Sequence, residues 1–206
     1  MRILAFNGSP RSRGNTSAII ASVLEGARSR GVDTKEIRLH DISLKGCMGC
    51  LSCRKKPGVC NQKDDLSPYL EEIKECVGMV VGCPIYMYRI SGQMKLFVDR
   101  LYSLYANKPG GGYYSMVPPG KTYGLVISQG ATDPNQYVRS IRYLEGMSGT
   151  GLGMIMKGKI VHADAGTRPA REDDSLLRNA FDLGCNMAEA IQIAISEERP
   201  EGLKRA

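Results

Sequence analysis

Short apolar segments with strand character alternate with segments of helical periodicity along this chain. The expected strands cover residues 2–7, 33–39, 77–82, 121–128 and 154–161. The expected helices cover residues 15–27, 64–76, 93–105, 135–145 and 172–197. Strands that are connected through helices pair in parallel, and the helices pack on the faces of the sheet. The alternation therefore predicts an α/β fold with a doubly wound, five-stranded parallel sheet.

The composition is that of a globular protein, with 42% hydrophobic and 24% charged residues in a chain of 206. We expect a single domain over residues 1–206, long enough to bury a core. Two segments interrupt the alternation. Residues 45–62 form a cysteine-rich loop after the second strand, and residues 106–120 are rich in glycine and proline. The second segment predicts a surface excursion that serves as an interface arm or a lid.

The net charge of +7 raises the question of nucleic-acid binding, but the positive residues are mostly scattered and no nucleic-acid-binding motif accompanies them. We expect no nucleic-acid partner. The first residues lack the apolar core of a signal peptide, and no run reaches the length of a membrane span. A cytoplasmic protein without a membrane contact is the expectation, and thiols stay reduced there.

The loop over residues 8–17 is polar, contains glycine and leads from the first strand into a helix. N–H groups at such a helix N-terminus bind phosphate, and Asn15 or Thr16 is a suitable N-cap. The loop is neither a Walker A motif nor a G-x-G-x-x-G sequence. Hydroxyl and amide side chains, with the charge of Arg11, can instead surround a single terminal phosphate such as that of FMN; they are Ser9, Ser12, Asn15, Thr16 and Ser17. A capped turn without a ligand is the alternative.

Two more loops are expected at the carboxyl edge of the sheet, where ligands bind in open α/β folds. The segment from residue 83 to 92 can present backbone amides and flat apolar side chains to an isoalloxazine ring. Its candidate residues are Pro84, Ile85, Tyr86, Met87 and Tyr88. A tyrosine-rich core loop is the alternative. The loop after the fourth strand adds the candidates Ser128, Gln129 and Gly130.

Four of the seven cysteines are spaced C-x2-C-x2-C-x6-C, and they are Cys47, Cys50, Cys53 and Cys60. A [4Fe–4S] cluster needs four converging thiolates, and short spacings let one loop supply three of them. Structural zinc usually takes ligand pairs from separate knuckles. Zinc or redox-active thiols are therefore a second interpretation, and unligated cysteines are a third. The other cysteines, Cys76, Cys83 and Cys185, lie near apolar runs and are expected in the core; Cys83 borders the candidate flavin loop.

Four stretches together carry a family resemblance: GSPRSRGNT at residues 8–16, the cysteine run at 47–60, the acidic pair at 64–65, and CPIYMYRISGQMKLFVDR at 83–100. The chain resembles the iron–sulfur flavoproteins of anaerobes, a branch of the NADPH-dependent FMN reductase group. The resemblance implies a flavodoxin-like fold with strand order 2-1-3-4-5. It covers residues 1–105 well and the rest weakly. The loop at 128–130 departs from the expected double-glycine turn.

The resemblance also implies cofactors and partners. FMN would be held at its phosphate by Ser9, Arg11, Asn15 and Thr16, and a [4Fe–4S] cluster by the four clustered cysteines. A homo-oligomer, a dimer or more specifically a homotetramer, would pass electrons from a ferredoxin-like donor through cluster and flavin to a small-molecule acceptor. The chemistry is that of the cofactors, so no side chain is assigned a catalytic role. The basic triplet 54–56 would make reduction of the cluster easier and would attract an acidic donor. The alternative is that these three residues only form a solvated face of the loop.

Two other functions stay open. One is an NAD(P)H-dependent FMN or quinone reductase whose cysteines bind no cluster. The other is a zinc-stabilised or redox-sensing binding module that uses its basic loop as an interaction surface. Visible absorbance separates the binding module from the electron-transfer protein and the reductase, because only these two flavoproteins should be coloured.

Overall fold

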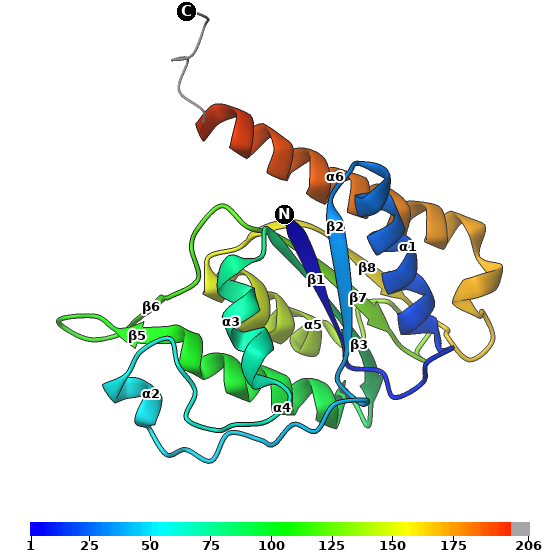
Figure 1. Cartoon of the computed structure of the whole chain (residues 1–206). Coiled ribbons are helices and arrows are strands. Elements are labelled where there is room, and N and C mark those ends of the chain that lie inside the picture. Colours follow the sequence, from blue (N-terminus) through cyan, green and yellow to red (C-terminus); the bar gives the residue numbers. More distant parts are fainter. Residues whose placement is uncertain (199–206) are drawn as a thin grey trace, which may run out of the picture.

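The computed structural model describes residues 1–198 and contains the predicted parallel sheet (Figure 1). Its strands are β1 (Arg2–Asn7), β2 (Asp33–Arg38), β3 (Gly78–Tyr86), β7 (Thr122–Ser128) and β8 (Ile155–His162). They run in the order β2-β1-β3-β7-β8, and every pair among them is parallel. The predicted order 2-1-3-4-5 is therefore confirmed. A short strand, β4 (Arg89–Ile90), pairs antiparallel with the end of β3.

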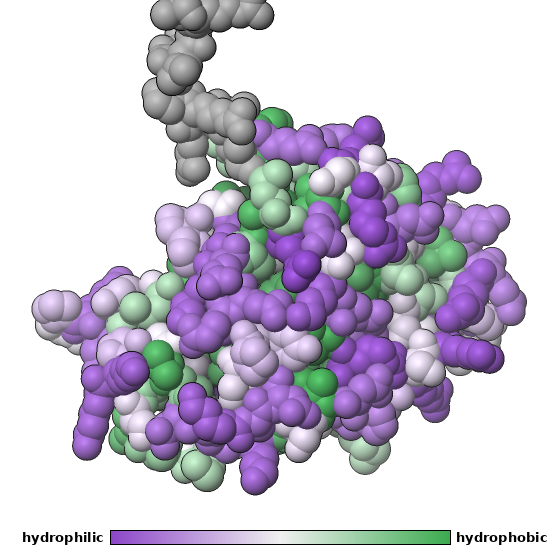
Figure 2. Space-filling model, in the orientation of Figure 1, coloured by the Kyte–Doolittle hydropathy of each residue, from purple (hydrophilic) through white to green (hydrophobic). Residues whose placement is uncertain are grey.

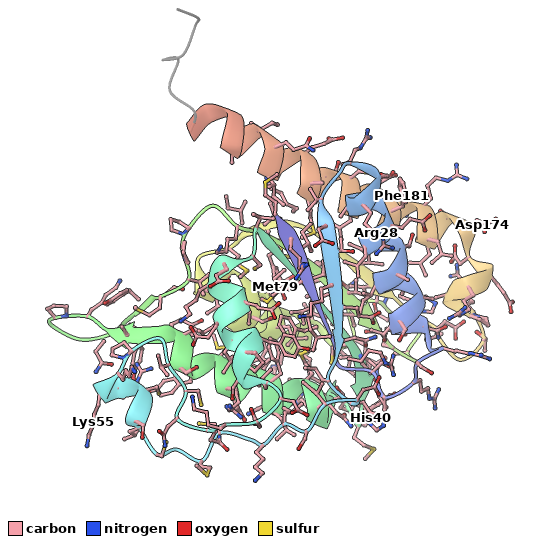
Figure 3. All side chains as sticks on the ribbon, in the orientation of Figure 1. Arg28, His40, Lys55, Met79, Asp174 and Phe181 are labelled. Carbon is pink, nitrogen blue, oxygen red and sulfur yellow. The ribbon has the colours of Figure 1, made fainter. Side chains whose placement is uncertain are left out.

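Helices cover both faces of the sheet. On one face, α1 (Asn15–Ser29) and α6 (Asp174–Glu198) enclose a core with the side chains of β1, β3 and β7 that point their way. On the other face lie α3 (Ser67–Glu75), α4 (Gly92–Arg100) and α5 (Val138–Leu144), which enclose the larger core. Met79, labelled in Figure 3, lies fully buried in this second core.

The helices α1 and α6 approach each other through glycines. A Cβ atom at Gly26 would overlap the carbonyl of Phe181, and one at Gly184 would overlap the carbonyl of Val23. Only a residue without a side chain permits this backbone-to-backbone contact. The contact fixes α6 against α1 on this face of the sheet (Figure 1).

Several boundaries differ from the prediction. The N-cap of α1 is Gly14, which makes no side-chain cap, so Asn15 and Thr16 already belong to the helix. The helix α3 begins at Ser67, and Asp64 lies before it in an ion pair with Arg100. The predicted helix 93–105 ends as a 3₁₀ turn over Leu101–Leu104, and a π-helical turn over Glu145–Gly149 and a 3₁₀ turn over Thr150–Leu152 follow α5.

The remaining elements are short. The glycine- and proline-rich excursion is a hairpin of β5 (Tyr105–Asn107) and β6 (Tyr113–Ser115) that projects from the molecule (Figure 1). The cysteine loop contains one helical turn, α2 (Ser52–Lys55), and a 3₁₀ turn over Ala170–Glu172 precedes α6. The surface in Figure 2 is mainly hydrophilic, with hydrophobic residues in small groups. Within residues 1–198, none of the helices combines the length and apolar character that a bilayer crossing requires.

Candidate functional site

A cavity of about 190 Å³ lies at the carboxyl edge of the sheet, the lower edge in Figure 1. It is lined by Ser9, Arg11, Gly14, Asn15 and Thr16 from the loop after β1, by Pro84, Ile85 and Tyr86 at the end of β3, by Ser128, Gln129 and Gly130 after β7, and by Ala165 and Gly166 after β8. Three loops that the sequence places 40 or more residues apart are thus brought together, and the loop after β8 joins them.

Side chains beneath the first loop hold its shape. The amide of Asn7 accepts a hydrogen bond from the N–H of Ser9 at 2.9 Å and donates one to the hydroxyl of Ser17 at 2.9 Å. Ser17 in turn donates to the carbonyl of Arg11 at 3.0 Å. Ser17 does not line the cavity. The structure gives it this bracing contact, and its predicted contact with a ligand stays a prediction.

The first turn of α1 offers hydrogen-bond donors to the cavity. The first N–H groups of a helix have no partner within it, and the cap residue Gly14 supplies no side chain. The hydroxyl of Thr16 and the guanidinium of Arg11 form no hydrogen bond to another side chain or carbonyl within residues 1–198. Backbone N–H groups, a hydroxyl and a positive charge are the donors that a phosphate requires.

Asn15 holds two loops together. Its amide donates to the carbonyl of Ala165 at 2.9 Å and accepts from the N–H of Ala170 at 2.9 Å. The oxygen and one of the two N–H groups of the side chain are therefore engaged, and the backbone N–H of Asn15 is left for a phosphate. The sequence indicated Asn15 as a contact but not this link across 150 residues.

The loop after β7 adds polar groups to the opposite wall. Gln129 is almost fully buried, and its Nε2 donates to the carbonyl of Asp133 at 2.7 Å, but its Oε1 has no partner within the described residues. Such an unpaired buried acceptor is costly unless a ligand donates to it.

Ser128 lies 3.3 Å from Nδ1 of His162. The other ring nitrogen lies 2.8 Å from the carbonyl of Arg168 and can only donate to it.

The turn between β3 and β4 is strained. Met87 and Tyr88 both have positive φ, 45° and 65°, as the central residues of a type I′ hairpin turn do. Neither is glycine, and such conformations persist where surrounding structure or function requires them. Both side chains are exposed, Met87 by 89% and Tyr88 by 64%, and neither lines the cavity. Of the predicted ring contacts, the structure brings only Pro84, Ile85 and Tyr86 to it.

The four clustered cysteines line one small cavity of about 60 Å³ beside α4. Cys47 and Cys50 are exposed, Cys53 and Cys60 are half-buried, and all four are free thiols. Within residues 1–198, no three or more His, Cys, Asp or Glu side chains come together closely enough to define a metal centre. The loop thus gathers the four thiols at one place without drawing their sulfur atoms into a complete ligand set.

Three of the four sulfur atoms accept hydrogen bonds. The N–H of Gly49 donates to Cys47 at 3.5 Å, Arg54 to Cys53 at 3.7 Å, and Arg100 to Cys60 at 3.2 Å. The hydroxyl and N–H of Ser52 lower the pKa of the Cys50 thiol. Such donors favour thiolates, the form in which cysteine binds iron. The chemistry of this donor set fits an iron–sulfur cluster.

Arg54 fastens the cysteine loop to the hairpin. It donates to the carbonyls of Tyr102 and Tyr105 at 2.7 and 2.6 Å, and its guanidinium lies 4.1 Å from the centre of the Tyr102 ring. Of the basic triplet, only Lys55 and Lys56 are exposed, and Lys55 projects away from the sheet (Figure 3). The predicted basic face is therefore these two lysines, without Arg54.

The other three cysteines are buried, as expected. Burial raises the pKa of Cys76 to about 11 and that of Cys83 to about 12. Cys83 accepts a hydrogen bond from the N–H of Ser91 at 3.4 Å and does not line the cavity.

A parallel sheet in this order, with a polar loop and a cavity at the carboxyl end of its first strand, defines a flavodoxin-like protein. Residues 1–132 match the family of NADPH-dependent FMN reductases. The chain therefore belongs to this family of flavin-dependent oxidoreductases.

Curated relatives carry a narrower name. An iron-sulfur flavoprotein of Methanocaldococcus jannaschii is 36% identical over 100 residues, which are 48% of this chain and 51% of the relative. An iron-sulfur flavoprotein of Archaeoglobus fulgidus is 27% identical over 194 residues, 93% of this chain and 81% of the relative. The first match spans only about half the length of that relative. A solved flavodoxin from the domain Archaea superposes with a TM-score of 0.56 at 18% identity, covering 93% of this chain and 99% of the flavodoxin, which supports the fold alone.

Proposed function

We propose that this chain is an FMN-dependent electron-transfer oxidoreductase that also holds a [4Fe–4S] cluster. It would take electrons from a ferredoxin-like one-electron donor and deliver them to a two-electron acceptor. When bound, FMN exchanges two electrons and a cluster exchanges one at a time, so that the pair connects the two kinds of partner. The observation that carries the proposal is the presence of two separate cavities, one lined by anion-binding groups and one by four thiols.

The residues around the larger cavity fit FMN. The first-turn amides of α1, the Thr16 hydroxyl and Arg11 would hold the phosphate. Ser128 and Gln129 would meet the polar edge of the ring, where the unpaired Oε1 of Gln129 would accept a hydrogen bond from it. Pro84, Ile85 and Tyr86 would exclude water from its apolar side. Binding and orientation are the protein's part in this chemistry.

The residues around the smaller cavity fit a cluster. Cys47, Cys50, Cys53 and Cys60 would be its ligands, and the donors at Gly49, Arg54 and Arg100 would stabilise the thiolate sulfur atoms, which raises a cluster's reduction potential. The names of the curated relatives support this assignment. The sulfur atoms would have to draw together on binding, because the described structure places no three of them as a metal centre.

Two partners belong to the proposal. The exposed Lys55 and Lys56 would attract an acidic, ferredoxin-like donor to the cysteine loop. A second copy of this chain would cover the exposed Met87 and Tyr88, which follow Tyr86 at the larger cavity. A homo-oligomer, most simply a dimer or a tetramer, follows.

The name of the family favours a second function, in which NADPH reduces the flavin directly and the cysteines hold no cluster. The family assignment also argues against a zinc-stabilised or redox-sensing binding module, which would need no flavin. Rapid NADPH oxidation without an added electron carrier would support the second function.

The deciding experiment is an anoxic purification with iron, sulfide, zinc and FMN quantified. We expect one FMN and, from the composition of a [4Fe–4S] cluster, about four iron and four sulfide per chain. Cys50→Ser should lose the iron and keep the FMN. Cys185→Ser, which changes a buried thiol next to α1, is the matched control and should keep both.

Each other result points to one alternative. FMN without iron under anoxic conditions would support the NADPH-dependent reductase without a cluster. Zinc without FMN would contradict the flavin assignment as well as the cluster.

A further inference from the structure

Arg100, the last residue of α4, is a buried cation that donates to four acceptor atoms of three residues. Its side chain has no exposed surface. Its Nε donates to the sulfur of Cys60 at 3.2 Å, and Nη1 donates to the carbonyl of Lys45 at 2.9 Å. Nη1 and Nη2 also contact the two carboxylate oxygens of Asp64 at 2.6 and 3.2 Å. All three guanidinium nitrogens thus donate to the cysteine loop or to its two ends.

Asp64 completes this arrangement. It is buried with Arg100 and also accepts from the N–H of Lys45 at 3.0 Å. The carboxylate of Asp64 also accepts a hydrogen bond from the hydroxyl of Ser67 at 3.2 Å. The pair therefore joins residue 45, two positions before the first clustered cysteine, to residues 60 and 64 at the other end of the run. It closes the loop at its base.

We propose that Arg100 is the positioning residue of the cluster loop: it fixes the Cys60 sulfur and closes the loop so that Cys60 can converge with the other three cysteines. This inference rests on the proposed cluster. A guanidinium is suited to the task because its planar set of N–H groups can serve a thiolate, a carbonyl and a carboxylate together, whereas the point charge of lysine cannot. Groups that orient metal ligands are typically worth 10- to 100-fold in affinity.

The competing explanation is that Arg100 and Asp64 form a purely structural ion pair. Two variants distinguish this explanation from the positioning role. Arg100→Met with Asp64→Asn removes both charges, and a buried pair exchanged as a whole is often neutral for stability. Arg100→Lys retains a charge for Asp64 but loses the bond to Cys60. The matched control is Lys35→Met with Glu72→Gln, which removes a partly buried ion pair of 2.9 Å between β2 and α3, away from the cysteines.

The test compares iron retention and thiol access in the anoxically prepared proteins. We measure the chelator concentration that removes half of the iron, the thermal midpoint without metal, and the alkylation rate of Cys60 in the metal-free protein by mass spectrometry. Both Arg100 variants should lose iron at a chelator concentration about tenfold lower. The alkylation is compared at a pH high enough to ionise exposed thiols, where loss of the Arg100 donor no longer limits the thiolate fraction, and there both variants should expose Cys60 to faster alkylation. The control should match the wild type in both.

Two results would overturn the inference. One is unchanged iron retention in Arg100→Lys, which decides the matter even if the double variant does not fold. The other is an equal loss of iron in the control variant, which would indicate general destabilisation. A wild type without iron would contradict the proposed function instead, and the Cys60 alkylation rates would still show whether Arg100 holds that sulfur.

Discussion

The hydroxyl of Ser91 donates a hydrogen bond to the carbonyl of Gly8 at 2.7 Å. Ser91 is also the N-cap of α4, because it accepts from the N–H of Met94 at 3.3 Å. The start of α4 is thereby tied to the loop after β1, and its last residue, Arg100, is tied to the cysteine loop. Nine residues of helix span about 13 Å, so that α4 sets the separation of the two candidate cofactor sites.

Ser91→Ala should therefore weaken both the helix and the phosphate loop. Loss of the cap and of a buried hydrogen bond should lower the free energy of unfolding by about 1–2 kcal/mol, measured by denaturant unfolding of the flavin-free protein. FMN affinity, measured by quenching of flavin fluorescence, should fall several-fold.

Ser22→Ala is the control for this change. Ser22 donates to the carbonyl of Leu177 at 2.6 Å, a comparable bond between α1 and α6. This variant should lose stability and keep its FMN affinity. Equal FMN affinities in the two variants would contradict the link from α4 to the loop.

Thr16→Val tests the phosphate contact directly. The change keeps the shape of a buried side chain and removes a hydroxyl, whose bond to a charged group is worth about 1.5–3 kcal/mol. FMN affinity should fall about tenfold or more. The control is Thr122→Val at the other end of the sheet, where the hydroxyl is buried without a partner among the described residues; it should leave FMN affinity unchanged and unfolding no easier. If the Thr16 variant bound FMN as tightly as the wild type, the hydroxyl of Thr16 would not contact the phosphate.

The thiols should fall into two classes. In metal-free protein near pH 8, an aromatic disulfide reagent should react quickly with the four clustered cysteines and slowly with the three buried ones. Burial keeps Cys76 and Cys83 protonated, with pKa values of about 11 and 12, and only the thiolate reacts. All seven should react in denaturant. Fast reaction of a fifth thiol in the native state would show that the core opens more easily than the structure indicates.

The sheet could be predicted from sequence because its signals are local. Apolar runs mark the strands, helical connections make them parallel, and right-handed crossovers leave few possible orders, among which the family resemblance indicates 2-1-3-4-5. The three predicted loops meet at one edge because parallel strands end there together. These predictions needed no knowledge of side-chain contacts.

The contacts that shape the sites could not be predicted in this way. Asp64 was expected to begin a helix, where an acid complements the helix dipole, but it pairs instead with Arg100, 36 residues away. Asn15 uses its side chain on the loop after β8 rather than as a cap. Met87 and Tyr88, in a turn with positive φ, are exposed and do not line the cavity, so that their predicted contact with a flavin stays a prediction. The partners of Asp64 and Asn15 are tertiary contacts that override a local preference.

Acid should destabilise the protein partly through Asp64. Burial alone would raise the pKa of this carboxyl, but the hydrogen bonds from Arg100 and from the N–H of Lys45 hold it below its ordinary value of 3.8. A lowered pKa in the folded state means that the unfolded chain binds the proton first. The contribution is therefore complete above about pH 5 and is lost as the pH falls through 3.8 toward the folded value. Denaturant unfolding between pH 2.5 and 6 should show this loss.

Asp33 provides the comparison, because Arg2 also lowers the pKa of its carboxyl, but that pair is exposed. Salt screens exposed charges and affects buried pairs much less. Adding 1 M salt should therefore abolish the difference between Asp33→Asn and the wild type in this pH range, whereas Asp64→Asn should keep a flatter pH profile than the wild type at any salt concentration. If salt removed both differences alike, the pair of Arg100 and Asp64 would be open to solvent, and the base of the cysteine loop would not be the closed structure described above.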